Sequence, residues 1–307
     1  MNNLIVSASP HIHNRTDTQR IMLDVLIAMC PMIIASVILF GWRSLLVIGV
    51  CVATCLIGEW GFEKIVKRPS TISDLSACVT GVILALNMPV TTPLWHVAFG
   101  VIVAIVVVKQ MFGGIGKNFA NPAITARVVM LIAFAGSMTT WIQPISDALS
   151  SATPLALIKM GAPERLPSLG DMFLGYRSGS LGETCTLAIL LGGIYLLIRR
   201  VITWHIPVSF IGTVFIITAI MGKQPVYQLM SGGLMLAAFF MATDYVTSPA
   251  TVKGKIIFGI GCGLITSLIR IWGNYPEGVS FAVLLMNICT PHINNLTRTK
   301  PLGGVNP

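Results

Sequence analysis

Residues 21–40 read IMLDVLIAMCPMIIASVILF, a run of twenty residues with one charged side chain, Asp24. A helix of about 20 apolar residues is long enough to cross a membrane, because each residue adds about 1.5 Å of length. The composition agrees with this: 54% of the 307 residues are hydrophobic and 10% are charged, against about 25% charged in soluble domains. The sequence therefore predicts an all-α polytopic membrane protein.

Nine further apolar windows follow the first. They lie at 44–62, 74–90, 94–110, 122–137, 183–198, 205–222, 228–244, 255–271 and 278–291. Ten spans place both termini on one side of the membrane, and with the N-terminus inside, thirteen Lys and Arg residues fall in inner segments and six in outer ones. This distribution follows the positive-inside rule. We therefore expect cytoplasmic termini, and we attribute the net charge of +9 to topology rather than to nucleic-acid binding.

An internal repeat divides the chain. VTTP at 90–93 and VTSP at 246–249 are 156 residues apart, and at the same offset Asn118-Phe119 matches Asn274-Tyr275. Each half has five spans, so the second half enters the membrane from the opposite side, as in the inverted repeats of transporters. We predict two inverted five-helix halves, 1–137 and 183–307, joined by an extracytoplasmic loop at 138–182.

Few ionisable groups lie in or near the predicted spans. Asp24 and Arg127 are the deepest, and such groups usually face the interior of a helix bundle. The others lie near predicted helix ends, where an interfacial charge is the simpler interpretation. They are Glu59, Glu63, Asp74, Asp244 and Glu277.

Two segments combine Gly or Pro with polar residues at the ends of spans: GGIGKNFANPA at 113–123 and ATDYVTSPA at 242–250. Non-helical backbone at membrane depth lines cavities in transporters, so both segments are candidates for a cavity wall. The alternative is a pair of ordinary connecting loops.

Other sites are less well supported. Seven cysteines lie mostly in apolar runs without a CxxC pair, which favours packing over metal binding. Cys51 and Cys55 share a helix face but lack a second pair of ligands, and His11 and His13 lack further partners, so we predict no metal site. There is no Ser-His-Asp set, no paired-carboxylate hydrolase signature and no GxGxxG turn.

DALSSATPLAL, at 147–157, stands out in the polar interval between the halves. Thr153 is a good N-cap and Pro154 a good first residue for a short helix that ends at Gly161. The same geometry presents a hydroxyl at a helix N-terminus, where an anion such as a phosphoryl group is favoured.

With these motifs in view, the sequence closely resembles the D subunits of the Rnf ion-translocating ferredoxin:NAD oxidoreductases, and it is similar to the B subunits of Na⁺-pumping NADH:quinone reductases. The resemblance covers nearly the whole chain, through SPHI at 9–12, GGIGKNFANPA, ATDYVTSPA and NYPEGVSFAVLLMN at 274–287. Its most specific part is the flavinylation motif Asp-x-x-Ser/Thr-Gly-Ala-Thr, here 147–153, with Ser151 in place of the usual Gly.

The resemblance implies that Thr153 carries FMN through a phosphoester bond, attached by a flavin transferase outside the cytoplasmic (inner) membrane of a prokaryote. Asp147, Ser150 and Ala152 are then recognition positions of the flavinylation motif. A second, non-covalent riboflavin occurs in the quinone-reducing relative and is compatible with this chain.

The resemblance also implies an electron-transfer role beside iron–sulfur and flavin subunits of the Rnf complex, coupled to outward transport of Na⁺ or H⁺. Asp24, Arg127 and Asp244 are then our candidates for the ion path. Two alternatives stay open: a flavin-free solute channel with the same inverted repeat, and the B subunit of a Na⁺-pumping NADH:quinone reductase. The short segment before Ile21 favours the Rnf subunit over the latter.

Overall fold

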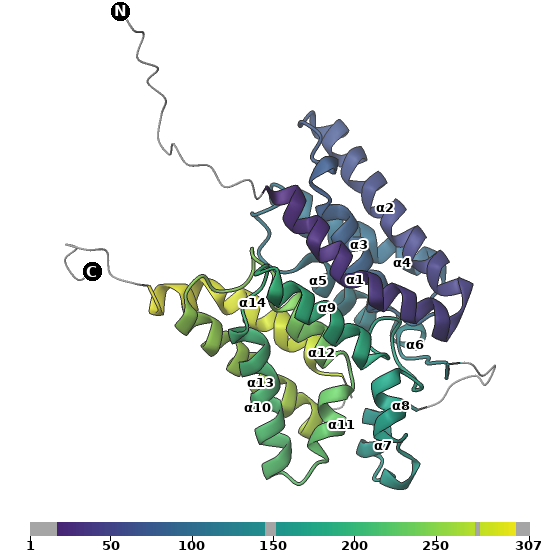
Figure 1. Ribbon diagram of the computed structural model, residues 1–307. Helices are drawn as coiled ribbons and strands as arrows, with labels where there is room; N and C mark the ends of the chain where they lie inside the picture. Colours follow the sequence, from purple (N-terminus) through teal and green to yellow (C-terminus); the bar gives the residue numbers. More distant parts are fainter. Residues whose placement is uncertain (1–16, 145–151, 274–276, 299–307) are drawn as a thin grey trace, which may run out of the picture.

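The computed structural model of the chain describes residues 17–144, 152–273 and 277–298, and these residues form helices joined by turns (Figure 1). The helices before the central interval are α1 (Thr18–Phe40), α2 (Trp42–Val66), η1 (Ile72–Asp74), α3 (Ser76–Leu86), α4 (Leu94–Ile102), the π-helix η2 (Val103–Gln110), α5 (Pro122–Ala133) and α6 (Ala135–Met138). The central interval holds α7 (Pro154–Lys159), η3 (Pro163–Arg165) and α8 (Leu169–Leu174). The remaining helices are α9 (Thr186–Ile198), α10 (His205–Ile220), α11 (Pro225–Met230), α12 (Leu234–Leu236), the π-helix η4 (Ala237–Met241), α13 (Val252–Trp272) and α14 (Val279–Leu296).

Three of these helices, α1, α2 and α13, are long and apolar enough to cross a membrane. Shorter apolar helices are α3, α4 continued by η2, α5, α9 and α10. All ten predicted windows contain helical residues in the structure. The windows at 74–90 and 228–244 differ most from the prediction, because the helix is interrupted or stops well inside each of them.

Helix α1 confirms the helix predicted from the first apolar run and extends it. The Asp17 carboxylate accepts a hydrogen bond of 2.7 Å from the Thr18 backbone N–H. A cap at Asp17 lets the helix begin three residues before Ile21. The helix ends at Gly41, which has a positive φ of 74° that a side chain with a Cβ rarely adopts.

Helix α3 ends inside the fold. After Leu86 the chain leaves the helical conformation through Pro89 and Pro93, which have no backbone N–H to continue a helix. The carbonyl of Leu86 accepts a hydrogen bond of 2.7 Å from the Gly182 N–H, and that of Met88 accepts one of 3.0 Å from the Leu181 N–H. A segment from the other side of the central interval therefore satisfies the backbone that α3 leaves unpaired.

The window at 228–244 is interrupted by Gly232 and Gly233, which adopt positive φ angles of 64° and 67°. This left-handed turn separates α11 from α12 and η4. The Arg270 guanidinium donates to the carbonyls of Gln228 at 2.6 Å and Ser231 at 2.8 Å, so a side chain satisfies the end of α11. Sequence windows of apolar residues could not show this break, because two glycines lower the mean hydropathy of the window only slightly.

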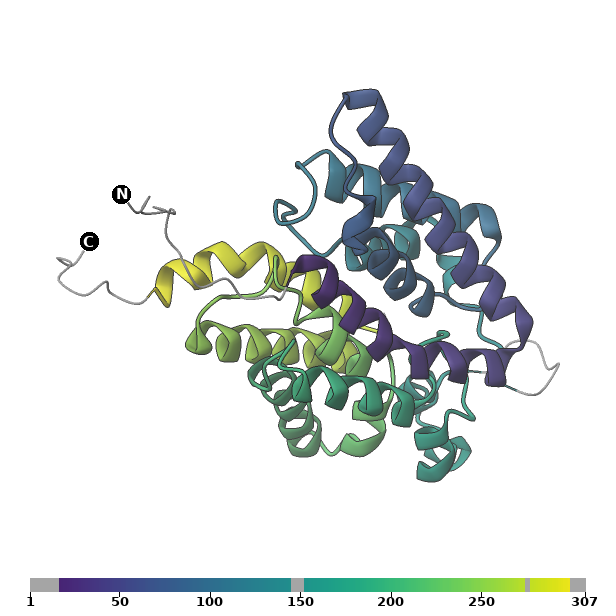
Figure 2. The ribbon, with the colours of Figure 1, turned by 45° about the horizontal axis from the view of Figure 1, so that its top comes forward.

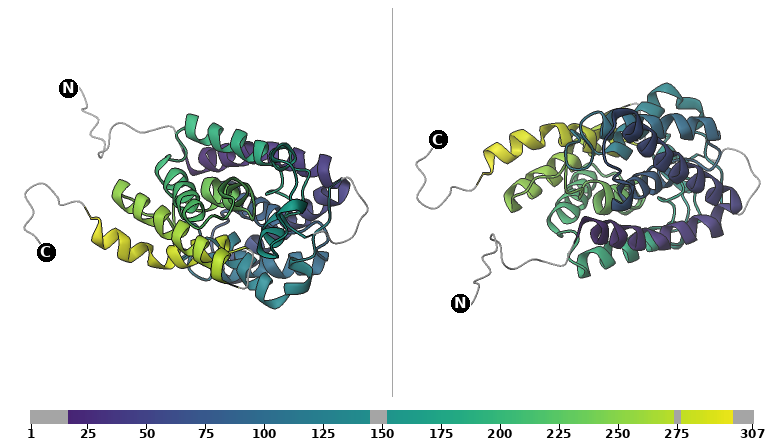
Figure 3. Two further views of the ribbon diagram at one scale, coloured as in Figure 1. Left: turned by 90° about the horizontal axis from the view of Figure 1, so that it is seen from below. Right: turned by 90° about the horizontal axis from the view of Figure 1, so that it is seen from above.

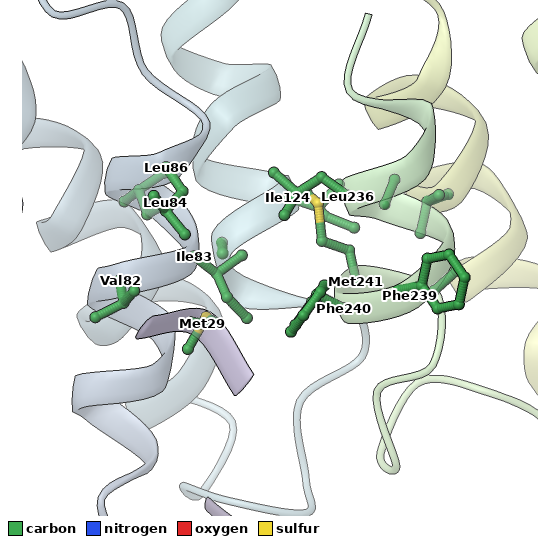
Figure 4. Packing of buried hydrophobic residues seen from close by; sticks show 14 of the residues in the cluster. Met29, Val82, Ile83, Leu84, Leu86, Ile124, Leu236, Phe239, Phe240 and Met241 are labelled. Carbon is green, nitrogen blue, oxygen red and sulfur yellow. The ribbon is translucent and has the colours of Figure 1, made fainter. Parts of the chain in front are cut away.

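The helices form two groups, α1–α6 and α9–α14, which meet along α1 and α9 (Figures 1 and 2). Gly192 of α9 lies against the backbone of Ala28, and a Cβ on Gly193 would lie 2.6 Å from the ring of Phe239. Both glycines therefore allow the close approach. Figure 4 shows the core between the groups, where side chains of α3 face those of α12 and η4. The labelled core residues are Met29, Val82, Ile83, Leu84, Leu86, Ile124, Leu236, Phe239, Phe240 and Met241.

Helices α7 and α8 lie together at one end of the molecule (Figure 1), the end that faces the viewer in the left view of Figure 3. This is the end where α1 stops, because a Cβ on Gly175, the C-cap of α8, would lie 2.8 Å from Leu39. We call it the Thr153 end. The opposite end, where α2 stops at Lys67, is the Lys67 end.

Candidate functional site

Thr153 begins α7 as predicted. Its Oγ1 accepts a hydrogen bond of 3.3 Å from the Ala156 N–H, and Pro154 occupies the first helical position. The predicted N-cap and first residue are thus confirmed, and Gly161 follows the helix with a φ of 71°. The Thr153 side chain is buried, with 6% of its surface exposed, whereas Ala152 is exposed. The motif positions Asp147 and Ser150 lie outside the described residues.

A hollow of about 1110 Å³, counting its open mouth, adjoins Thr153 at the Thr153 end. It is large enough for a cofactor-sized ligand. Two cations, Arg165 and Arg177, line it beside one carboxylate, Asp171, which accepts a hydrogen bond of 2.7 Å from Ser168. The full set of lining residues is Gln143, Ala152, Pro154, Leu157, Arg165, Pro167, Asp171, Tyr176, Arg177 and Ser178.

A second cavity, of about 810 Å³ with its mouth, opens at the Lys67 end between the two groups of helices. Both Gly/Pro-containing segments of the sequence contribute to its wall, which confirms that they line a cavity. From 113–123 come Ile115, Asn118, Asn121, Pro122 and Ala123, and from 242–250 come Thr243, Asp244, Tyr245 and Val246. The wall is completed by apolar residues of α1, α3, α9 and η4, by Val201 and Ile202 after α9, and by Ser76, Thr80 and Lys109.

Asp24 lies on α1, its side chain faces α9, and the residue is 8% exposed. Its carboxylate accepts hydrogen bonds from the Tyr195 hydroxyl at 3.0 Å and from Arg199 at 3.2 and 3.3 Å. The ion pair joins the first helix of one group to the first helix of the other. Asp24 is therefore placed in the interior, as its sequence position suggested, but it has a cationic partner.

Arg127 lies on α5 and is 4% exposed. Its guanidinium donates to the side-chain oxygen of Asn87, at the end of α3, and forms an ion pair with Glu277, which precedes α14. Nearby, Asn121 caps α5 by accepting from the Ala123 N–H at 3.0 Å. Arg127 thus connects α3, α5 and the start of α14.

Asp244 lies in the wall of the cavity at the Lys67 end. Its carboxylate accepts a hydrogen bond of 3.0 Å from the Thr247 hydroxyl. The three candidates for an ion path therefore have three different sets of partners: Asp24 pairs with Arg199, Arg127 with Glu277, and Asp244 with a hydroxyl.

The interfacial interpretation of Glu59 and Glu63 is wrong, because the two side chains are 0% and 3% exposed. Glu59 pairs with Lys109 at 2.7 Å and accepts from Gln110 at 2.7 Å, while Glu63 accepts from the Thr71 hydroxyl at 2.5 Å. Lys109 also donates to Ser76 at 2.6 Å. Sequence windows placed these residues near helix ends and could not show that α3 and η2 cover them.

Sequence reasoning also missed the charged residues around 177–184. Arg177, Glu183 and Arg270 are 3%, 3% and 5% exposed, although the sequence places them in a loop or at predicted helix ends. RSGSLGET at 177–184 indicates a turn by its small residues, but such turns usually lie on the surface, so nothing in the sequence indicates its burial.

The fold has long apolar helices, helices that stop inside it, and charged groups buried between them. These features define a multi-pass membrane protein whose apolar core contains buried charges. The chain belongs to the NQR2, RnfD, RnfE family, whose model matches residues 5–303. This confirms the resemblance seen in the sequence motifs.

Three curated relatives cover nearly the whole chain. It is 45% identical over 304 residues to the D subunit of the Na(+)-translocating ferredoxin:NAD(+) oxidoreductase complex of Acetobacterium woodii, spanning 98% of this chain and 96% of that protein. It is 41% identical over 316 residues to the D subunit of the proton-translocating ferredoxin:NAD(+) oxidoreductase complex of Clostridium ljungdahlii (97% and 96%). It is 36% identical over 344 residues to the D subunit of the ion-translocating oxidoreductase complex of Aliivibrio salmonicida (97% and 98%).

Proposed function

We propose that this chain is the membrane electron-transfer component, the D subunit, of an ion-translocating ferredoxin:NAD oxidoreductase complex, with FMN esterified to Thr153. The relatives named above support the complex. The observation that carries the flavin assignment is the position of Thr153, which ends the motif at 147–153 and adjoins a cofactor-sized hollow. In this account the chain acts with iron–sulfur and flavin subunits of the complex and is not catalytic alone.

The residues beside Thr153 suit a flavin. Arg165 and Arg177 supply positive charge for a phosphate or a reduced ring, and Tyr176 supplies an aromatic surface. FMN in such a site supplies electron-transfer chemistry, while the protein sets its position and electrostatic surroundings. Because the Thr153 side chain is buried, a flavin transferase needs the start of α7 to open; a helix of six residues has few internal hydrogen bonds to oppose this.

We further propose that the chain crosses the cytoplasmic membrane ten times as two inverted repeats, with the Lys67 end inside and the Thr153 end outside. Two features support this. The repeated segments VTTP and VTSP both follow a helix that stops inside the fold, and α5 and α14 both begin after a non-helical segment. The predicted inner segments also hold the excess of Lys and Arg.

For the coupling ion, we propose Na⁺ or H⁺ without a choice between them, because the Acetobacterium relative is named for Na⁺ and the Clostridium relative for protons. Asp24, Arg127 and Asp244 remain our ion-path candidates. The ion pair of Asp24 with Arg199 lies where the two helix groups meet, so a change in its charge alters the contact between the groups.

Replacing Asp24 by Asn should lower ion transport more than electron transfer, because it removes a buried charge without removing a redox group. The measurement is the ratio of ions transported to electrons transferred in proteoliposomes. Asp17→Asn is the matched control, since Asp17 is the exposed N-cap of the same helix and Asn caps as well as Asp. Equal loss of both activities, or no loss of either, counts against the role.

We propose that the cavity at the Lys67 end is the binding site of a second, non-covalent flavin. Thr80→Trp, which fills part of the cavity, should remove the flavin extractable by denaturation and leave the covalent flavin on Thr153. Thr54→Trp on α2 is the control, because Thr54 is not a wall residue of the cavity. The amounts of extractable and of covalent flavin are measured in each variant. Extractable flavin at the wild-type level in Thr80→Trp would exclude this cavity as the binding site.

The main rival is a flavin-free solute channel with the same repeats. Flavin fluorescence of the polypeptide in a denaturing gel discriminates, because a covalent flavin stays with the chain while a bound one is lost. A fluorescent band supports the redox function, and its absence from active complex supports the channel. The B subunit of a quinone-reducing pump, the second alternative, would belong to a complex that transfers electrons from NADH to a quinone rather than between ferredoxin and NAD.

A further inference from the structure

A smaller hollow, which we call the basic pocket, lies between α7, α11 and the end of α13. Its volume is about 480 Å³, counting its open mouth, and it shares no wall residue with the hollow beside Thr153. Three wall residues are cations: Lys159 on α7, Lys223 in the turn after α10, and Arg270 on α13. None of the wall residues is a carboxylate. The uncharged ones are Leu155, Ile158, Gln228 and Ile271.

Arg270 is the buried member of this wall, with 5% of its surface exposed. Its two Nη groups donate to the carbonyls of Gln228 at 2.6 Å and Ser231 at 2.8 Å, which hold the guanidinium against the end of α11. Its Nε is buried and has no hydrogen-bond partner among the described residues. A buried donor without an acceptor is unfavourable, so Arg270 favours a ligand that brings an acceptor into the pocket.

The two lysines are placed by helix ends. The Lys159 ammonium donates to the carbonyl of Gly273, the C-cap of α13, and an ammonium has three N–H groups to donate. Lys223 follows Gly222, whose φ is 66°, and its backbone N–H donates to the Thr218 carbonyl at 2.9 Å. This turn ends α10 and fixes the position from which the Lys223 side chain reaches the pocket.

The charges around the basic pocket leave a positive surplus. Beyond its wall, Arg270 interacts with Glu277, Glu183 and Arg177, and Glu277 is itself paired with Arg127. Two carboxylates therefore face five cations, the three of the wall and the two further arginines. Such a surplus favours an anion, and a phosphate group accepts hydrogen bonds from both Lys and Arg.

The helices that carry Lys223 and Arg270 also present apolar side chains to their surroundings. On α13, Leu264, Leu268 and Trp272 follow one another at intervals of four residues and are 45%, 51% and 63% exposed. Ile220, at the end of α10, is 78% exposed, and α10 and α13 pack along each other. In a membrane such a surface contacts acyl chains, and tryptophan is enriched at the level of the lipid headgroups. The basic pocket is thus placed where lipid phosphates lie.

We propose that the basic pocket binds the phosphate group of an anionic phospholipid, whose acyl chains lie on the exposed face of α10 and α13. Basic pockets between membrane helices bind lipid headgroups in this way. A zwitterionic lipid fits less well, because it brings its own cation beside Lys159 and Lys223. The bound lipid contacts both α7 and α13, so it stabilises the position of the helix that begins at Thr153. The proposal does not depend on the flavin or on the coupling ion.

The test uses the full chain, purified and delipidated in mixed micelles, with bound lipids counted by native mass spectrometry during a titration. The probes are phosphatidylglycerol, phosphatidylcholine and inorganic phosphate. The double variant Lys159→Gln with Lys223→Gln removes two charges of the pocket and leaves buried Arg270 in place. The matched control is Lys117→Gln with Lys253→Gln, which removes the same charge from two exposed lysines at the Lys67 end. The unfolding midpoint without lipid verifies that each variant is folded.

Wild type should bind its first phosphatidylglycerol more tightly than phosphatidylcholine. The Kd of that first phosphatidylglycerol should rise about tenfold or more in the pocket variant, since each lysine near a lipid phosphate contributes to binding, and it should stay within about twofold in the control. Phosphatidylcholine binding should be the same in all three proteins.

An unchanged Kd for phosphatidylglycerol in the pocket variant overturns the proposal, and so does an equal rise in the pocket variant and the control, which would reflect total charge alone. Equal affinity of wild type for the two lipids is also contrary. Inorganic phosphate that binds wild type but not the pocket variant, without a lipid preference, would show that the pocket takes a free anion and would exclude the lipid.

Discussion

Thr153→Ala should abolish the covalent flavin of the protein and reduce electron transfer through the complex to background. Without the Thr153 hydroxyl there is no oxygen to form the phosphoester, and no other protein group can replace the electron-transfer chemistry of the flavin. The structural effect of the change is small by comparison, since loss of an N-cap costs about 1 kcal/mol. In-gel flavin fluorescence and ferredoxin:NAD electron transfer measure the two outcomes.

Two further variants distinguish the role of Thr153 as the attachment point of FMN from its role as the N-cap of α7. Thr153→Asn caps a helix at least as well as Thr but has no hydroxyl, so it should lose flavin and electron transfer although α7 is intact. Thr153→Ser keeps both the cap and the hydroxyl and should retain at least part of the flavin. Electron transfer at the wild-type rate in Thr153→Asn would show that the hydroxyl acts only as a cap.

Arg127→Met should destabilise the protein by about 3–5 kcal/mol, the usual effect of removing one partner from a buried ion pair. The change leaves the Glu277 carboxylate without its cation and Asn87 without its donor. The expected result is a lower midpoint of unfolding in detergent and a lower yield of assembled complex. Unfolding of the purified protein in mixed micelles measures the decrease in its free energy of unfolding.

The double variant Arg127→Met with Glu277→Leu is the control, because it removes both charges together. It should recover much of the stability, since a buried pair replaced by apolar side chains is often neutral. Arg199→Met is a second comparison. The Arg199 side chain is 42% exposed, so its replacement should lower the free energy of unfolding only slightly. Equal stability of wild type and Arg127→Met would show that the pair with Glu277 does not hold the two helix groups together.

Much of the fold was predictable from the sequence, for local reasons. The run at 21–40 predicts α1 because hydrophobic length alone specifies such a helix, and Thr153-Pro154 predicts the start of α7 because capping depends on adjacent residues. The segments 113–123 and 242–250 were recognisable as cavity walls because Gly, Pro and polar residues interrupt apolar runs there.

The rest depends on contacts between distant parts of the chain. The pair of Glu59 with Lys109 joins residues fifty positions apart, and Arg127 with Glu277 joins residues of different halves. Hydrophobicity windows carry no information about such partners. The burial of Glu183 is similar, because it follows from the packing of residues 177–184 against the end of α3.

The mass of the peptide that contains Thr153, taken from active complex purified from its native host, shows whether FMN is esterified to this residue. We expect the peptide mass plus FMN less one water, with the modification on Thr153 in fragment spectra. The unmodified mass in complex that still transfers electrons would exclude a covalent flavin on Thr153 as an electron carrier.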